Sequence, residues 1–264
     1  MKQMDLMGWL FLFLGLPLVL LLTLPLVKMT TEPSVAMLKE TIADKDVLAA
    51  IARSIGLSLC AAGLAFTMGT PLAYLLARKE LPGKRLLEGI IDLPIMIPHP
   101  VVGIAILSLA GKNHPIGRFL SDAGIQIMGT KTGIICVLLF VGLPFYINTV
   151  KSGFDSVPVR LENASRTLGA GAFTTFMRIT FPLTWRHMIL GTIMCTARAI
   201  SEFGAVVIVA YHPMTAPVMI YERFTAFGLK YSQPIAVWLI FISFALFVLL
   251  RMLSKSIHPT AGNP

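Results

Sequence analysis

Residues 54–77 read SIGLSLCAAGLAFTMGTPLAYLLA and contain no Asp, Glu, Lys or Arg. This run is long enough to cross a bilayer, because a membrane-spanning helix needs about 20 apolar residues. Three further runs lack these charges and have similar lengths: Leu6–Val27, Thr132–Val150 and Pro234–Leu250. The sequence therefore predicts a polytopic membrane protein and excludes a soluble enzyme built around one buried core.

Composition supports this class. The 264 residues are 56% hydrophobic and 13% charged, whereas soluble globular domains are about 25% charged. Two more apolar stretches carry internal charges and are counted as spans: Gly89–Ala110 with Asp92, and Met188–Ala210 with Arg198 and Glu202. We therefore expect an all-α fold with about six transmembrane helices. The hydrophilic segments between them are too short for a soluble domain, so residues 1–264 are expected to form one transmembrane domain.

The distribution of basic residues predicts the topology. With six spans both termini lie on one side, and the segments on that side carry 12 Lys and Arg against 9 in the opposite loops. Because cytoplasmic loops are enriched in Lys and Arg, we expect both termini in the cytoplasm of a multi-pass cell-membrane protein. The net charge of +9 is spread over both faces, which does not favour nucleic-acid binding.

The longest of these cytoplasmic segments, residues 151–187, predicts a helix, a glycine turn and a second helix. Gly169-Ala170-Gly171 is expected to end the first helix, because glycine is the usual C-terminal cap. The second helix, residues 172–180, is expected to stop at Pro182. The segment is either an interfacial hairpin between two spans or a docking surface for a cytoplasmic partner.

The first helix of this hairpin has two predicted faces. Leu161, Ala164 and Leu168 recur at helical spacing and form a narrow apolar face. Glu162 and Arg166 are four residues apart and are expected to pair on the exposed side.

Three prolines interrupt the third apolar stretch. Pro94, Pro98 and Pro100 lie within seven residues, so the helix must break or kink there. Irregular backbone at membrane depth is tolerated only against protein or a wet cavity, which makes this stretch a candidate wall of a translocation pathway. His99 either satisfies a backbone carbonyl freed by the kink or contacts a substrate.

The fifth apolar stretch carries a possible buried ion pair. Arg198 and Glu202 share a helix face, with Ser201 beside them. The two charges either compensate each other inside the bundle, or Arg198 lines the pathway as a cation whose charge Glu202 partly offsets. Asp92 is expected to be a helix N-cap or the partner of a loop cation. The candidate pathway residues are Pro94, Ile97, Pro98, His99, Pro100, Arg198, Ser201 and Glu202.

The sequence contains none of the common catalytic motifs. The sequence has no HExxH, no GxSxG and no phosphate-cradling GxxxxGK[ST]. We therefore expect neither a metal site nor an enzymatic activity, and any ATP hydrolysis must lie on another chain.

The hairpin resembles the EAA loop of ABC importer permeases. The resemblance is carried by Glu162-Asn163-Ala164, by Gly169 five residues after Ala164, and by Ile179 and Pro182. Asn163 replaces the first Ala of the family pattern, and Phe181 replaces the Leu before Pro182. The ATPase-coupling loop that this resemblance implies contains Leu161, Glu162, Asn163, Ala164, Arg166, Leu168, Gly169 and Pro182.

Three further segments resemble permeases for tetrahedral oxyanions. Residues 92–107 and 197–211 are similar to their third and fifth spans, and residues 212–224 are closer to the molybdate/tungstate branch than to the sulfate branch. The resemblance implies a homodimer, two ATP-binding subunits, an extracytoplasmic binding protein, and no cofactor. The alternatives are a sulfate/thiosulfate permease of the same kind and an ATP-independent secondary transporter or channel. An integral-membrane enzyme is disfavoured by the missing motifs.

Overall fold

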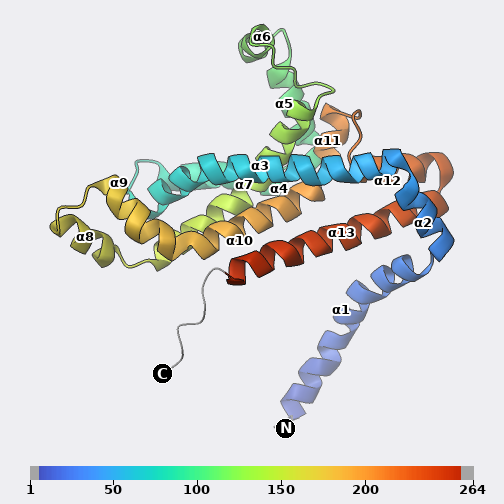
Figure 1. Cartoon of the computed structure of the whole chain (residues 1–264), viewed down its shortest axis with the longest axis horizontal. Helices are drawn as coiled ribbons and strands as arrows, with labels where there is room; N and C mark the ends of the chain where they lie inside the picture. The colour runs from blue at the N-terminus through green and yellow to red at the C-terminus, as the bar shows by residue number, and fades with distance from the viewer. Residues whose placement is uncertain (1–5, 257–264) are drawn as a thin grey trace.

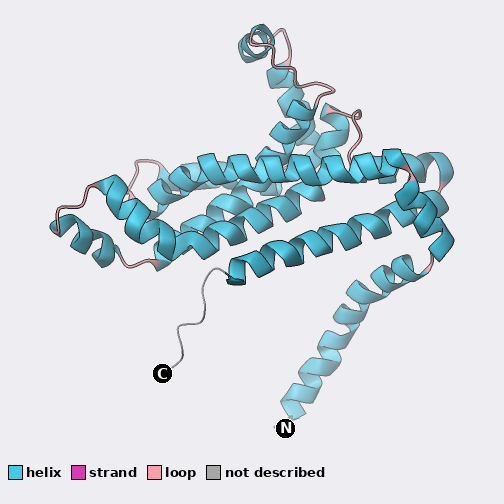
Figure 2. Cartoon of the chain, in the orientation of Figure 1, coloured by secondary structure: helices cyan, strands magenta, loops and turns pink. Residues whose placement is uncertain are grey.

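The structure is a computed structural model that describes residues 6–256, and this part of the chain is helical with no strand (Figure 2). The helices are α1 (Leu6–Thr31), α2 (Val35–Ala43), α3 (Lys45–Arg78), α4 (Lys84–Met96), α5 (His99–Ala110), α6 (Pro115–Asp122), α7 (Lys131–Ser156), α8 (Val159–Thr167), α9 (Ala172–Thr175), a π-helical turn η1 (Phe176–Thr180), α10 (Phe181–Ile200), α11 (Gly204–Val209), α12 (Ala216–Phe227) and α13 (Leu229–Ser256).

Four helices are long and apolar enough to cross a membrane: α1, α3, α7 and α13. They contain the four charge-free runs, so these predictions are confirmed. The helices extend beyond the runs, and α3 has 34 residues. The α3 helix continues through charged and polar residues beyond the apolar run, so the length of the run underestimates the length of the helix.

The third expected span is two helices. The break that the prolines predict is present, because α4 and α5 meet at an angle of 114°. Residues 89–110 therefore do not form one continuous helix, as the prolines predict. As one broken span, the pair brings the number of membrane-crossing segments in residues 6–256 to five.

The expected span at residues 188–210 is also wrong as a single helix. The α10 helix starts at Phe181 and ends at Ile200, and the short α11 follows after residues 201–203. The α10 helix ends before residue 210 because the helical backbone breaks beside Glu202. The Glu202 carboxylate accepts a hydrogen bond from the Ala205 N–H at the start of α11.

The centre of the molecule is a bundle of α3, α7 and α10, which lie side by side in Figure 1. Small residues permit this close packing. A Cβ added to Gly142 on α7 would lie 2.6 Å from the Cys195 sulfur on α10, and one added to Gly69 on α3 would lie 2.8 Å from the Tyr146 ring on α7. The α13 helix covers α10, whereas α1 diverges from the bundle and is exposed along its length.

Two features project from this bundle. The α8–α9 hairpin lies at one end of it, and α5 leads outward to α6 as an arm (Figure 1). At the base of the arm, α5 packs against α11. The two broken segments therefore meet at the side of the bundle from which the arm leaves.

Candidate functional site: a broken-helix junction and a cytoplasmic hairpin

The first candidate site is the junction of α5, α10 and α11. His99 is the first residue of α5, Arg198 lies in the last turn of α10, and Glu202 follows it in the loop to α11. Arg198 Nη2 lies 2.8 Å from Glu202 Oε2 and 2.9 Å from His99 Nε2. His99 Nδ1 is 3.5 Å from Glu202 Oε2. The predicted Arg198–Glu202 pair is therefore present, and His99 joins it from another element.

The three side chains differ in exposure. The Glu202 side chain is 1% exposed, that of Arg198 is 19% and that of His99 is 42%. The Glu202 carboxylate also accepts the Ala205 N–H at 2.8 Å, so both of its oxygens have partners. Its buried charge links the end of α10 to the start of α11 and α5. The accessible edge of the junction is formed by an imidazole and a guanidinium.

Of the two roles expected for His99, a hydrogen bond to a freed backbone carbonyl is not seen in the part of the chain that the structure describes. Its ring lies against the Arg198 and Glu202 side chains instead. His99 follows the turn at Ile97 and Pro98, and its ring contacts Arg198 on α10. Gly204 makes this approach possible, because a Cβ there would lie 3.0 Å from the His99 Cβ and 3.3 Å from the Pro100 ring.

The remaining pathway candidates have structural positions around this junction. Pro94 is buried inside α4, Ile97 and Pro98 form the turn between α4 and α5, and Pro100 is the second residue of α5. Ser201 donates its hydroxyl to the Arg198 carbonyl oxygen at 3.0 Å. It also lines a mostly apolar cavity of about 250 Å³ between α10 and α13.

Asp92 is not at this junction and has neither of its expected roles. It lies inside α4, and its carboxylate accepts a hydrogen bond from the Asn148 amide on α7 at 2.7 Å. Because α4 begins at Lys84, eight residues earlier, Asp92 is too far along the helix to cap it.

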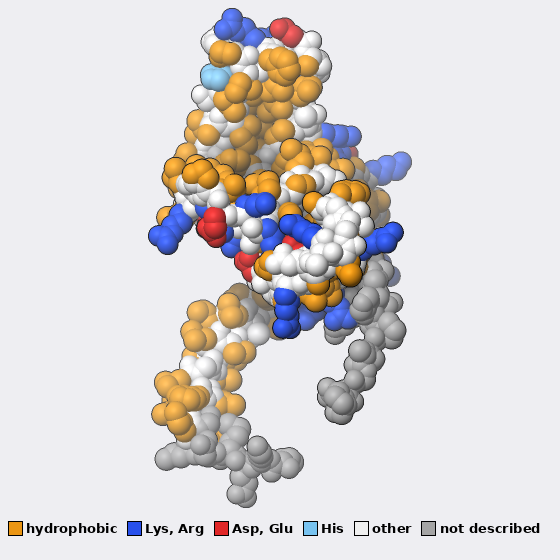
Figure 3. Space-filling model, turned by 90° about the vertical axis from the view of Figure 1, so that its left-hand side faces the viewer, with side chains coloured by type: hydrophobic (Ala, Val, Ile, Leu, Met, Phe, Trp, Pro, Cys, Tyr) orange, Lys and Arg blue, Asp and Glu red, His pale blue; other side chains and the backbone are white. Residues whose placement is uncertain are grey.

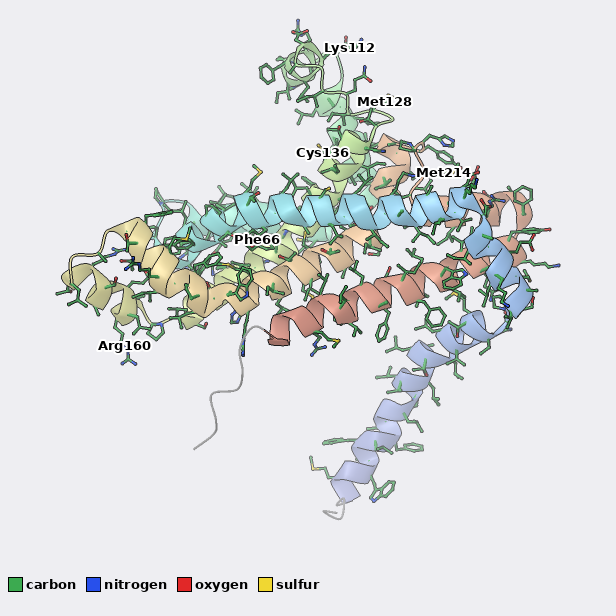
Figure 4. All side chains as sticks on the ribbon, viewed as in Figure 1. Phe66, Lys112, Met128, Cys136, Arg160 and Met214 are labelled. Carbon is green, nitrogen blue, oxygen red and sulfur yellow. The ribbon has the colours of Figure 1, made fainter. Side chains whose placement is uncertain are left out.

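The second candidate site is the α8–α9 hairpin, the end of the molecule that faces the viewer in Figure 3. Lys, Arg and hydrophobic side chains surround this end (Figure 3), and Arg160 extends away from the bundle (Figure 4). The apolar face that the sequence predicts points outward, with Leu168 89% and Leu161 40% exposed. Phe173 on α9 adds a side chain that is 73% exposed. The hairpin therefore presents an apolar surface with basic residues around it.

The predicted glycine turn is confirmed. Gly169 has φ +87°, a left-handed conformation that favours glycine. Its N–H bonds to the Arg166 carbonyl, and the Ala170 N–H bonds to the Ser165 carbonyl, which is the hydrogen-bond pattern of a Schellman C-cap.

The expected helix stop at Pro182 is wrong. The chain continues through α9 and η1 into α10 with helical backbone from Ala172 to Ile200. The π-helical turn bonds the Phe181 N–H to the Phe176 carbonyl. Pro182 is thus the second residue of α10 and follows directly on the π-helical turn.

The expected exposed pair of Glu162 and Arg166 is also wrong, because Glu162 is 3% exposed and points into the molecule. Its carboxylate is 2.8 Å from Arg78 Nε at the end of α3 and accepts hydrogen bonds from Tyr74 and Thr180. The sequence analysis did not include these three partners. In the sequence, Arg78 stands out only as the first charged residue after the 54–77 run. No spacing rule relates it to Glu162.

The fold is that of ABC importer permeases. This chain superposes on a chain of a bacterial ABC transporter that imports alginate, with a TM-score of 0.75 at 16% identity. The superposition covers 95% of this chain and 96% of that chain. The TM-score is 0.66 at 13% identity with a chain of the methionine transporter MetNI, over 81% of this chain and 96% of the other.

The chain belongs to the family of binding-protein-dependent transport system inner membrane components, whose model matches residues 69–259. The resemblance to ABC importer permeases is thus confirmed, and the chain is a multi-pass inner-membrane protein. It is 42% identical over 214 residues to the molybdate/tungstate transport system permease protein WtpB of Methanocaldococcus jannaschii, covering 81% of this chain and 84% of that protein. Identity to WtpB of Pyrococcus furiosus is 44% over 216 residues, which is 82% of each chain. The sulfate transport system permease protein CysT of Synechocystis is 30% identical over 192 residues, which is 71% of this chain and 67% of that protein.

Proposed function

We propose that this chain is the permease subunit of an ABC importer that moves molybdate or tungstate across the cell membrane by alternating access. The observation that carries the proposal is the identity of 42–44%, over more than four fifths of the chain, to permeases named for these two ions. Sulfate permeases are more distant, at 30–32% identity.

The chemistry of the broken-helix junction supports an oxyanion as the substrate. Molybdate and tungstate are tetrahedral dianions, and the accessible edge of the junction holds a guanidinium and an imidazole. Glu202 lies behind this edge and offsets part of the Arg198 charge at 2.8 Å. An unpaired cation at membrane depth would hold a dianion too firmly, whereas transport needs a site that the ion can leave. Arg198 paired with Glu202 would therefore attract an oxyanion and still release it.

The assembly that we propose contains two copies of this chain, two ATP-binding subunits and an extracytoplasmic binding protein. The α8–α9 hairpin would dock an ATP-binding subunit in the cytoplasm through its exposed apolar surface of Leu161, Leu168 and Phe173. With α10 as a sixth crossing segment, both termini would then lie on the cytoplasmic side. The tip of the α5–α6 arm would lie outside the lipid, because charged residues there, such as Lys112 and Arg118, are unsuited to it.

Two other functions would make different use of the same chain. A sulfate permease would share the assembly and differ only in selectivity. An ATP-independent transporter or channel would need no docking hairpin, and family membership argues against it because members depend on a binding protein.

The test is reconstitution of the complex in liposomes. The chain is purified from its native membrane with the subunits that accompany it, and uptake of labelled molybdate, tungstate and sulfate is measured with and without ATP. We expect a co-purified P-loop ATPase and ATP-dependent uptake of the first two ions that excess sulfate does not suppress. Preferential sulfate uptake would support the first alternative, and uptake without ATP would support the second.

A further inference from the structure

A buried side-chain cluster joins the hairpin to the bundle. The Glu162 cluster consists of Glu162 on α8, Arg78 and Tyr74 on α3, and Thr180 at the junction of η1 and α10. Glu162 Oε1 accepts hydrogen bonds from Arg78 Nε at 2.8 Å and from Thr180 Oγ1 at 3.0 Å, while Oε2 accepts one from the Tyr74 hydroxyl at 3.2 Å. One carboxylate on α8 thus contacts two other elements, α3 and η1.

The guanidinium in this cluster has a second contact. Arg78 Nη2 donates to the Val157 carbonyl oxygen at 2.9 Å, and Val157 lies between α7 and α8. Arg78 therefore holds both the entry to the hairpin and the first turn of α8. The Arg78 and Glu162 side chains are 7% and 4% exposed. Removing one member of such a buried ion pair leaves the other charge uncompensated, so the pair resists separation.

The cluster and the docking surface lie on different faces of α8. Leu161 and Leu168 are exposed, whereas the neighbouring Glu162 is buried against α3. A partner seated on the exposed side of α8 would not reach the carboxylate in this arrangement. Glu162 therefore acts within this chain and does not form part of the docking surface.

We propose that Arg78 is a positioning residue for coupling: by holding Glu162, it fixes the hairpin to the end of α3, so that displacement of a docked ATPase subunit moves the bundle. The inference rests on the proposed function of the hairpin. Without the cluster, α8 keeps the backbone connections at its two ends and its contacts with α9 and η1, but loses the side-chain link to α3. Movement of the partner would then bend the hairpin and leave α3 in place.

The test separates coupling from assembly. Arg78→Gln removes the cation, and Tyr74→Phe removes one hydrogen bond while keeping the ion pair. Lys151→Gln is the matched control, because Lys151 forms a 3.4 Å ion pair between α7 and α4 whose members are 25% and 34% exposed. For each variant, we would measure retention of the ATPase subunit, ATP hydrolysis, and uptake per ATP hydrolysed.

We expect Arg78→Gln to retain the ATPase and to hydrolyse ATP while its uptake per ATP falls at least about tenfold, because an unpaired buried carboxylate favours release of the hairpin. Tyr74→Phe should show a smaller loss of about twofold, and Lys151→Gln should match the parent. Unchanged uptake per ATP in both cluster variants would overturn the proposal. Loss of ATPase retention in parallel with uptake would overturn it too, because Arg78 would then be needed for docking.

Two further measurements keep the test decisive if Arg78→Gln does not fold or if the parent complex shows no uptake. If Arg78→Gln does not fold, Tyr74→Phe still decides the outcome because it leaves both charges in place. If the parent complex takes up no oxyanion, the proposed function fails, and the cluster is then tested by hydrogen exchange over residues 159–180. Faster exchange there in Arg78→Gln than in Lys151→Gln supports the positioning role, and equal exchange refutes it.

Discussion

Replacing Arg198 and Glu202 by glutamine, singly and together, tests the broken-helix junction most directly. The two single substitutions are not equivalent, because the Glu202 side chain is 1% exposed and the Arg198 side chain is 19% exposed. Arg198→Gln leaves a buried carboxylate with the Ala205 N–H and a histidine 3.5 Å away. Breaking a buried ion pair in this way costs about 3–5 kcal/mol of the free energy of unfolding.

The reverse substitution should cost less. Glu202→Gln removes the buried charge, keeps an amide oxygen for one hydrogen bond, and leaves a guanidinium that reaches solvent. Loss of one charged hydrogen bond corresponds to about 1.5–3 kcal/mol. The double variant contains no unpaired charge, so its cost should be smaller than the sum of the single costs by at least about 1 kcal/mol.

The assay is unfolding of the purified protein in detergent at increasing denaturant, with Ser201→Ala as the control. Ser201 is exposed and bonds only to a backbone carbonyl in this region, so its removal should change the free energy of unfolding by less than about 0.5 kcal/mol. Additive single costs, or a larger cost for Glu202→Gln than for Arg198→Gln, would refute the reasoning. In reconstituted complexes, Glu202→Gln should also bind molybdate more tightly and turn over more slowly, because Arg198 loses its compensating charge.

Three further predictions concern the hairpin, the bundle and the topology. Gly169→Ala should weaken ATPase co-purification, because an alanine at φ +87° costs about 1–2 kcal/mol at the turn. Gly142→Ala should destabilise the protein by about 1–3 kcal/mol through its clash with Cys195, whereas Gly63→Ala, with nothing within 4 Å, should not. A cysteine introduced by Thr174→Cys on α9, where the native side chain is exposed, should react with an impermeant thiol reagent only after the membrane is opened.

Local chemistry explains what the sequence predicted well. A helix that crosses a bilayer has to be apolar along its own length, so the four charge-free runs identify α1, α3, α7 and α13 without knowledge of their neighbours. The break between α4 and α5 follows from prolines within the segment itself. The turn at Gly169 follows from the backbone freedom of one residue. Each of these features depends on fewer than about 25 consecutive residues.

The contacts of the two candidate sites depend on residues far apart in the chain. Glu162 and Arg78 are 84 positions apart, and His99 and Arg198 are 99 apart. On helical spacing alone, Glu162 pairs with Arg166, and only the approach of α3 to α8 shows that Arg78 is the stronger partner. For the same reason, the sequence did not indicate that His99 contacts Arg198 and Glu202. A single sequence contains no signal for such pairs, because periodicity describes one helix and not its neighbour.

The two sites are connected by one continuous element. Thr180, at the start of α10, belongs to the Glu162 cluster, and Arg198, in its last turn, belongs to the broken-helix junction. The intervening helix of 20 residues is about 30 Å long and packs along α7 and α3. A buried carboxylate contacts it near each end, from α8 at one end and from the loop before α11 at the other. We therefore expect α10 to move as one element, so that a displacement of the hairpin held by Arg78 would reach Arg198 through α10 itself.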